Sequence, residues 1–309
     1  MTESPSATTK PLLRSPVRWY GGKGQFVYRL LPLLPRPEQY RQYVEVFGGG
    51  ASLLFGKPPS PIEVYNDLDG GLVNFFRVLQ REETFARFER IVALTPVSQE
   101  AFTDARDEWR DFEDPIEAAA AFFIRARQNF SGSMTASAWG RSVFESHRHM
   151  VSSCSRWLTA VEHLPEIAAR LLRVQIEQRD FREILCGTVR SSCYAREDTL
   201  FYCDPPYPAP TRGTSHTSYY KHEMTEADHA DLVEILLQIR GQAIVSGYDS
   251  PLYAPLEDAG WRRLEWETVA HSVVMPNGGG KRADYPRTEV VWLSPGIPAT
   301  QPRLQMGEE

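Results

Sequence analysis

Tyr43-Val44-Glu45-Val46-Phe47-Gly48-Gly49-Gly50 carries the clearest structural signal in the chain. A short run of apolar, β-forming residues that ends in three glycines predicts a strand leading into a tight turn. We expect a helix to begin at Ala51, and a second strand at residues 62–65 to end at Asn66-Asp67. A strand, a Gly-rich turn and a helix in this order let a ligand approach the backbone at a helix N-terminus.

Strands and helices continue to alternate toward the C-terminus. We expect strands at residues 174–177, 199–203, 243–246, 262–269 and 289–293, and helices near 181–185 and at 226–239. This alternation predicts an α/β fold with a largely parallel sheet. Residues 72–130 and 151–172 are helical in pattern, with breaks near Thr95-Pro96 and Asp114-Pro115, and residues 131–149 are expected to be a loop. We therefore predict a catalytic domain (11–81 and 173–296), an inserted helical domain (82–172) and two tails (1–10 and 297–309).

Composition and charge exclude several classes of protein. The 309 residues include 34 Lys/Arg and 40 Asp/Glu, a net charge of −6, which argues against a protein coated in positive charge. Residues 81–118 hold eleven acidic residues and five arginines, whereas residues 1–42 hold seven basic residues and two acidic ones. The acidic segment is expected to form solvated helix faces. The basic stretches on either side of it could line one cleft.

Cysteine content and hydropathy restrict the location. The four cysteines form no C-x-x-C pair, so we expect neither a disulfide framework nor a cysteine zinc site, and a reducing compartment. No apolar run approaches the length of about 18 residues that a transmembrane helix needs. The histidines suggest no metal-ligand set.

An acidic residue follows the second predicted strand. Asp67 lies 22 residues after Glu45, where a carboxylate can accept hydrogen bonds from ribose hydroxyls. The alternative is that Asp67 caps the helix that follows it. The dinucleotide fingerprint G-x-G-x-x-G is absent, because Leu53 stands three positions after Gly50, and this disfavours an NAD enzyme.

Asp204-Pro205-Pro206-Tyr207 follows another predicted strand. The two prolines fix the backbone and remove two N–H donors, which leaves a rigid loop with a carboxylate, free carbonyls and an aromatic face. This set suits a planar molecule that carries an amino group, although a plain Pro-rich turn has the same letters.

A third segment, Arg18-Trp19-Tyr20-Gly21-Gly22-Lys23-Gly24, precedes the first strand. Its paired glycines permit close approach of the backbone, Lys23 can meet an anion, and Trp19 or Tyr20 can pack on a ligand. An exposed loop is an equally good interpretation of this segment on its own.

Taken together and in this order, the three segments resemble the Dam-like family of DNA adenine-N6 methyltransferases, with the α-group order of motifs. The resemblance covers most of residues 16–295 and extends to Tyr219-Tyr220-Lys221, the predicted strand at residues 243–247 and Arg287-Thr288-Glu289-Val290. It implies a Rossmann-like sheet that binds S-adenosylmethionine, with an inserted target-recognition domain. It also implies methyl transfer to the N6 amino group of adenine in a specific duplex DNA sequence, with base flipping.

The resemblance assigns roles to individual residues. Cofactor-binding positions are matched by Trp19, Tyr20, Lys23, Glu45, Phe47, Gly48, Gly49, Asp67, Asp180, Phe181 and Asp204. Of these, Lys23 would lie near the methionine carboxylate, Asp67 at the ribose, and Asp180 with Phe181 at the adenine. The catalytic loop is matched by Asp204, Pro205, Pro206 and Tyr207. The sequence departs from the family's F-x-G-x-G turn, since Ala51 stands where the second glycine is expected.

The inserted block would bind the DNA. Phosphate contacts are expected from Arg125, Arg127, Arg141 and Arg148, and base-edge contacts from Gln128, Asn129, Ser133 and Trp139. The block lacks the asparagine- and arginine-rich stretch of relatives that methylate GATC, so a GATC target is not assumed. We expect double-stranded DNA as the partner, no metal, a monomer or weak dimer, and the cytoplasm of a bacterial or phage-infected cell, near the nucleoid. The alternatives are the same chemistry on RNA or a protein amide, and a non-catalytic, sequence-specific DNA-binding protein.

Overall fold

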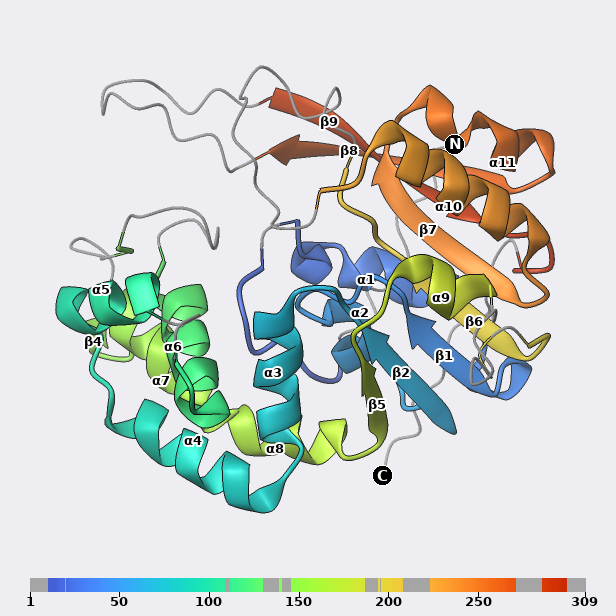
Figure 1. Ribbon diagram of the computed structural model, residues 1–309. Helices are drawn as coiled ribbons and strands as arrows, with labels where there is room; N and C mark the ends of the chain where they lie inside the picture. Colours follow the sequence, from blue (N-terminus) through green and yellow to red (C-terminus); the bar gives the residue numbers. More distant parts are fainter. Residues whose placement is uncertain are drawn as a thin grey trace, which may run out of the picture.

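The computed structural model describes residues 11–19, 21–108, 112–129, 139–140, 146–186, 194, 196–207, 223–270 and 285–298. Within these residues, seven strands form one sheet in the order β5-β2-β1-β6-β7-β9-β8 (Figure 1). The strands are β1 (Gln42–Glu45), β2 (Ile62–Asn66), β5 (Val174–Glu177), β6 (Thr199–Cys203), β7 (Gln242–Tyr248), β8 (Arg262–Ala270) and β9 (Tyr285–Leu293). The five neighbouring strands β5, β2, β1, β6 and β7 pair in parallel, and β9 is antiparallel to both its neighbours, β7 and β8. The expected α/β fold with a largely parallel, Rossmann-like sheet is confirmed.

Parallel pairing brings the carboxyl ends of β1, β2 and β6 to the same edge of the sheet. Glu45, the last residue of β1, lies beside Tyr65 of β2 and Tyr202 of β6. Strand β1 is buried along its whole length, as is usual for a parallel sheet with helices on both faces. The polar residues that follow these strands therefore converge on one region.

Helices cover both faces of the sheet. One face carries α9 (Phe181–Cys186), α10 (Glu226–Gln238) and α11 (Ala254–Asp258), and the other carries α1 (Val27–Leu30), α2 (Ser52–Gly56) and α3 (Gly70–Leu79) (Figure 1). Each face has its own apolar core. Val44 packs in the core under α9, α10 and α11, and its neighbour Tyr43 packs in the core under α1, α2 and α3, because successive strand residues point to opposite faces. Short 3-10 helices are η1 (Lys23–Gln25), η2 (Leu31–Leu33), η3 (Pro37–Gln39) and η5 (Pro251–Tyr253).

A group of helices packs beside α3, at the left of Figure 1. It comprises α4 (Glu82–Leu94), α5 (Gln99–Glu108), α6 (Pro115–Gln128), α7 (Ser152–Glu162) and α8 (Leu164–Leu171). Aromatic rings join these helices: Phe123 of α6 stacks on Phe75 of α3 at 5.6 Å and contacts Trp157 of α7 at 5.3 Å. No helix among the described residues is long and apolar enough to cross a membrane.

One local expectation for this segment was wrong. Residues 146–147, expected in a loop, form strand β3 (Ser146–His147), which pairs antiparallel with β4 (Met150–Val151). Residues 151–172, expected to be helical, form two helices, α7 and α8, with His163 between them. Pro165 stands in the first turn of α8, where proline is tolerated, so the apolar periodicity continues across the break.

A buried ion network links α8 to the sheet. Glu63 of β2 is fully buried and binds Lys57 (Nζ–Oε1 2.6 Å) and, through both oxygens, Arg170 of α8 (Nη2–Oε1 2.8 Å). Burial alone would raise the pKa of Glu63, but hydrogen bonds from Arg170 and the charge of Lys57 hold that pKa below its usual value. Breaking such a network is costly, because it leaves an uncompensated buried charge.

Candidate active site

One pocket opens at the carboxyl ends of β1, β2 and β6. Its lining includes every described residue that the sequence assigned to the cofactor, and also Pro205 and Pro206 of the proposed catalytic loop. Those cofactor residues are Trp19, Lys23, Glu45, Phe47, Gly48, Gly49, Asp67, Asp180, Phe181 and Asp204. Tyr20 lies outside the described residues. Residues as far apart in the chain as Trp19 and Asp228 thus line one cavity, whose walls are partly aromatic and partly acidic.

The Gly-rich turn forms one wall of this pocket. A Cβ atom added to Gly48 would lie 2.1 Å from Cε2 of Tyr65, so no larger residue fits there without displacing that ring. Ala51, which stands where the family pattern has glycine, adopts the left-handed conformation (φ +55°). A non-glycine residue pays about 1 kcal/mol or more for this conformation. Alanine therefore occupies a backbone conformation that favours glycine, the residue that the family pattern has at this position.

Asp67 closes the pocket at the end of β2. Its Oδ2 accepts a hydrogen bond from the N–H of Gly49 (2.7 Å), and its Oδ1 accepts one from the N–H of Asp69 (2.8 Å). The helix-capping alternative for Asp67 is wrong, because Asp69 caps α3 by accepting from Gly71 and Leu72. Removal of the Asp67 carboxyl from bulk water raises its pKa to about 6.

Glu45 presents a buried acceptor at the end of β1. Oε1 accepts hydrogen bonds from the Tyr43 hydroxyl (2.8 Å) and the Leu54 N–H (2.7 Å). Oε2 is buried and has no hydrogen-bond partner among the described residues. Burial raises the pKa of Glu45 to about 8. The site therefore holds an unsatisfied acid oxygen that a positively charged ligand group would stabilise.

Lys23 connects the first segment to the catalytic loop. Its ammonium lies 2.8 Å from Asp204 Oδ1 and 2.8 Å from Glu289 Oε1, and it donates a third hydrogen bond to the Tyr207 hydroxyl. These contacts use all three N–H groups of the ammonium. Burial opposes the charge, but Asp204 and Glu289 together raise the pKa of Lys23 well above its usual value.

Two polar residues that contact the loop Asp204 to Tyr207 were not predicted as site residues. Ser246 of β7 donates to Asp204 Oδ1 (2.9 Å), and Glu289 of β9 accepts from the Tyr207 hydroxyl (3.1 Å). The ring of Tyr207 packs on Tyr248 at 4.1 Å. Both residues lie in stretches that resemble the family, Ser246 in the strand at residues 243–247 and Glu289 in the closing stretch, but neither was assigned a role.

Comparison with known proteins decides the family. A family model described as D12 class N6 adenine-specific DNA methyltransferase matches residues 19–267. The chain belongs to this family. It is similar to a DNA adenine methylase of Vibrio cholerae, with 24% identity over 280 residues that span 87% of this chain and 92% of the relative. It is also similar to the type II methyltransferase M1.LlaDCHI of Lactococcus lactis (24% identity; 78% of this chain, 83% of the relative) and to a DNA adenine methylase of Salmonella typhi (23%; 77% and 82%).

Membership of the D12 class confirms the resemblance and the activity. The protein is an adenine-specific DNA methyltransferase that acts on the N6 amino group, and its substrate is DNA. The alternatives of an RNA or protein-amide substrate and of a silent DNA-binding protein are not supported. Within the described residues there is no group of three or more His, Cys, Asp or Glu side chains placed to hold a metal ion.

The D12 methyltransferase places its expected DNA-binding residues in different environments. Arg125, Gln128 and Asn129 are buried, and Asn129 forms an isolated β-bridge with Trp139. Arg148 is exposed and pairs with Glu162 (3.3 Å). Ser133 and Arg141 lie outside the described residues.

Arg127 belongs to a cluster of positive charge with Arg18 and Arg156, so the structure brings together residues from the two basic stretches that flank the acidic segment. Its Nη2 donates to the backbone carbonyl of Arg156 (3.0 Å). Desolvation, together with the like charges of Arg18 and Arg156, lowers the pKa of Arg127 to about 10. Like charges that depress one another's pKa favour the approach of an anion.

Proposed function

We propose that the methyl donor is S-adenosylmethionine and that the pocket at the ends of β1, β2 and β6 holds it. The observation that carries this proposal is the buried, unpartnered Oε2 of Glu45 in a pocket that also contains Asp67, Asp180 and Phe181. These residues fit the parts of that cofactor: a carboxyl for its ammonium, Asp67 for its ribose, and Asp180 with Phe181 for its adenine. When bound, S-adenosylmethionine supplies an electrophilic methyl group on a sulfonium.

Asp204 and the Pro205 carbonyl would then activate the target amino group. The lone pair of an adenine amino group is delocalised into the ring, and hydrogen bonds from its two N–H groups to these oxygens would localise it on nitrogen. Lys23 and Ser246 both contact Oδ1 of Asp204, and no described residue donates to Oδ2, which is left to accept from the base. Positioning and fixed charges account for this catalysis, without a covalent enzyme intermediate.

The target adenine must leave the duplex to reach this loop, at a cost of a few kcal/mol. We propose that residues 82–172 form the target-recognition domain and that the cluster of Arg18, Arg127 and Arg156 contacts the DNA backbone. Each phosphate neutralised by a basic residue releases counterions. DNA binding should therefore weaken steeply with salt, although the net charge of the chain is −6.

The setting follows from the substrate. We propose that the enzyme acts as a monomer or weak dimer on chromosomal or phage DNA in the bacterial cytoplasm. The bacterial relatives and the DNA substrate support this location.

The test is substitution of the carboxylate at the centre of the mechanism. Asp204→Ala should lower methyl transfer to DNA, measured with tritiated S-adenosylmethionine, by about 10²–10³-fold. The affinity for S-adenosylhomocysteine, measured by titration calorimetry, should change less than about fivefold, since a hydrogen bond is worth about 1 kcal/mol net and Oδ1 of Asp204 is already engaged by Lys23 and Ser246. Asp258→Ala, an exposed carboxylate on α11, is the matched control and should keep full activity. Full activity of Asp204→Ala would refute the mechanism.

A further inference from the structure

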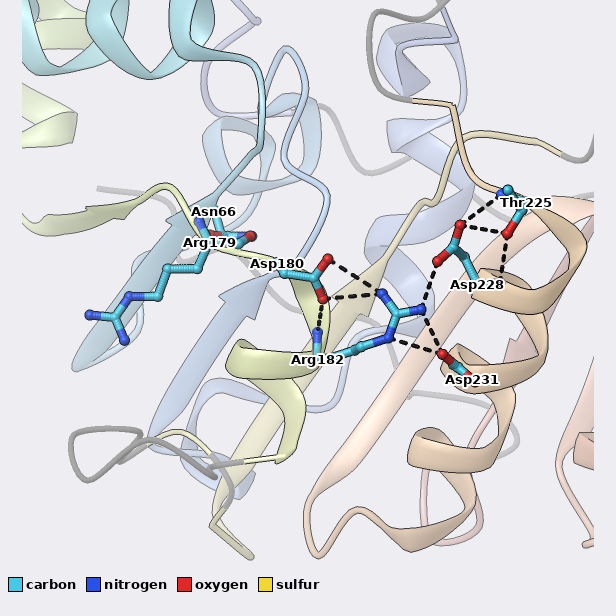
Figure 2. Close-up of polar contacts among 7 residues, drawn as sticks. All are labelled: Asn66, Arg179, Asp180, Arg182, Thr225, Asp228 and Asp231. Carbon is cyan, nitrogen blue, oxygen red and sulfur yellow. Dashed lines mark hydrogen bonds and ion pairs between the residues drawn. The ribbon is translucent and has the colours of Figure 1, made fainter.

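Residues 179–182 form the wall of the pocket that follows β5, and a side chain from β2 fixes one end of this wall. Asn66, which is buried, donates from Nδ2 to the carbonyl of Arg179 (3.0 Å), and its Oδ1 accepts from the N–H of Arg179 (2.9 Å) (Figure 2). The same amide donates to the carbonyl of Val46 (2.9 Å). The Asn66 side chain thus joins two backbone segments that border the pocket, one at Val46 and one at Arg179.

Arg182 fixes the other end. Its guanidinium lies between Asp180, which directly precedes α9, and two carboxylates of α10: Nη2 is 2.6 Å from Asp228 and 2.6 Å from Asp231, and Nη1 is 3.4 Å from both oxygens of Asp180 (Figure 2). The backbone N–H of Arg182 also donates to Oδ1 of Asp180 (2.9 Å). Carbon Cζ of Arg182 also lies 4.4 Å from the centre of the Phe181 ring. Arg182 therefore touches both residues assigned to the cofactor's adenine.

Asp228 anchors this arrangement to the start of α10. One of its oxygens binds Arg182, and the other accepts from the N–H and the hydroxyl of Thr225 (2.8 and 2.7 Å), which completes a capping box. Hydrogen bonds from Arg182 and Thr225 lower the pKa of Asp228 to about 2. The carboxylate thus stays charged throughout the neutral range, and the link between α9 and α10 persists with it.

The chemistry of adenine recognition requires a fixed carboxylate. Asp180 is partly exposed, and an exposed carboxylate on its own rotates freely and makes weak hydrogen bonds with poor direction. A planar guanidinium that meets several carboxylates restricts both partners, which an ammonium cannot do in the same way. Such geometry converts Asp180 into a directed acceptor for an exocyclic amino group.

We propose that Arg182 is a positioning residue for the adenine of the methyl donor: it orients the Asp180 carboxylate and supports the Phe181 ring, so that the pocket distinguishes adenine from a purine that lacks the amino group. This inference rests on the proposed cofactor. Among the described residues, Arg182 contacts none of the loop residues Asp204 to Tyr207, so we expect its contribution in cofactor affinity and not in the methyl-transfer step.

The experiment compares two ligands on the purified full-length enzyme. The dissociation constants of S-adenosylhomocysteine and of its analogue with purine in place of adenine are measured by titration calorimetry. A hydrogen bond to a charged group is worth about 1.5–3 kcal/mol, so the wild type should prefer adenine by about tenfold or more. Arg182→Gln should reduce this preference to below about threefold. The KM for S-adenosylmethionine should rise about tenfold, with kcat at saturating cofactor changed less than twofold.

Matched variants separate positioning from general destabilisation. Arg263 also binds three carboxylates, those of Asp249, Glu257 and Glu265, but lines no part of the pocket, so Arg263→Gln should leave the adenine preference unchanged. Asp231→Asn removes one arm of the Arg182 network at an exposed position and should reduce the preference partially, even if Arg182→Gln folds poorly.

The outcomes are distinct. An unchanged adenine preference in Arg182→Gln and Asp231→Asn overturns the inference, while methylation by the wild type keeps the proposed function intact. A wild type without any adenine preference also overturns it, because Asp180 then does not read the amino group. Failure of the wild type to bind S-adenosylhomocysteine at all overturns the proposed cofactor itself.

Discussion

Replacing Lys23 by methionine removes a buried cation that lies between the carboxylates of Asp204 and Glu289. The ammonium lies 2.8 Å from both Asp204 and Glu289, whose side chains are 15% and 5% exposed. Methionine keeps the length and apolar stem of lysine but leaves both carboxylates without this partner. We expect the free energy of unfolding to fall by about 3–5 kcal/mol, the usual cost of removing one partner from a buried ion pair.

The pH dependence of this variant follows from Glu289. Burial already raises the pKa of Glu289, and the charge of Lys23 is the main influence that lowers it. Without Lys23, that pKa rises further. A carboxyl whose folded pKa is raised contributes stability below its unfolded pKa of about 4.5 and loses it as the pH rises through the folded value. The stability of Lys23→Met should therefore decline between pH 5 and pH 8 relative to the wild type.

A double-mutant cycle measures the coupling. Urea unfolding followed by tryptophan fluorescence at pH 5.5, 7.0 and 8.5 is carried out on the wild type, Lys23→Met, Glu289→Gln and the double variant. The double variant should regain about half of the lost stability at pH 7, because one of the two unpaired charges is gone. Methyl transfer should stay low in it, since Asp204 still lacks its cation. A loss below about 1 kcal/mol in Lys23→Met, or no recovery in the double variant, would refute the ion-pair interpretation.

Three further substitutions test other parts of the site. Because the pKa of Glu45 is about 8, binding of a positively charged cofactor at pH 7.5 should release a proton from this carboxyl. Calorimetry in two buffers of different ionisation enthalpy should detect the released proton in the wild type and not in Glu45→Gln. Equal proton release in both proteins would contradict this prediction. Arg170→Met leaves part of the charge of buried Glu63 uncompensated and should lower the free energy of unfolding by about 3 kcal/mol in urea, with cofactor affinity unchanged; a loss under about 1 kcal/mol speaks against it. Gly48→Ala places a methyl group 2.1 Å from the Tyr65 ring and should weaken S-adenosylhomocysteine binding at least tenfold, so that undiminished affinity would show that the turn can adjust.

Much of the pocket could be predicted from local sequence, for a topological reason. Glu45, Asp67 and Asp204 each lie at or just after the end of a strand whose apolar pattern is visible in the sequence. In a parallel sheet those ends meet at one edge, so correct strand ends imply a correct cluster. The backbone conformation of the Gly-rich turn could not be predicted in the same way, because Ala51 adopts a left-handed conformation that the sequence pattern alone does not assign to alanine.

The residues that were missed depend on pairing between distant segments. Glu289 reaches Lys23 only because β9 pairs antiparallel with β7, which places Glu289 beside Tyr248. Asn66 was recognised only as a strand end, yet its amide joins β1 to the segment after β5. No periodicity or local motif reports such contacts, because each one joins residues at least 20 positions apart in the chain.

The acidic net charge does not oppose a DNA substrate, because the charges that matter are separated in space. Arg87 of α4 pairs with Asp114 and Glu117 at the beginning of α6, so part of the acidic segment is neutralised where it lies. Arg127 stands at the other end of α6, thirteen residues from Asp114, which is about 20 Å along a helix. At 0.1 M salt the Debye length is about 10 Å, so exposed charges at one end of α6 are largely screened from the other. A phosphate near Arg127 therefore experiences the local arginine cluster and not the chain's average, which is why local charge is the better guide to a nucleic-acid partner here.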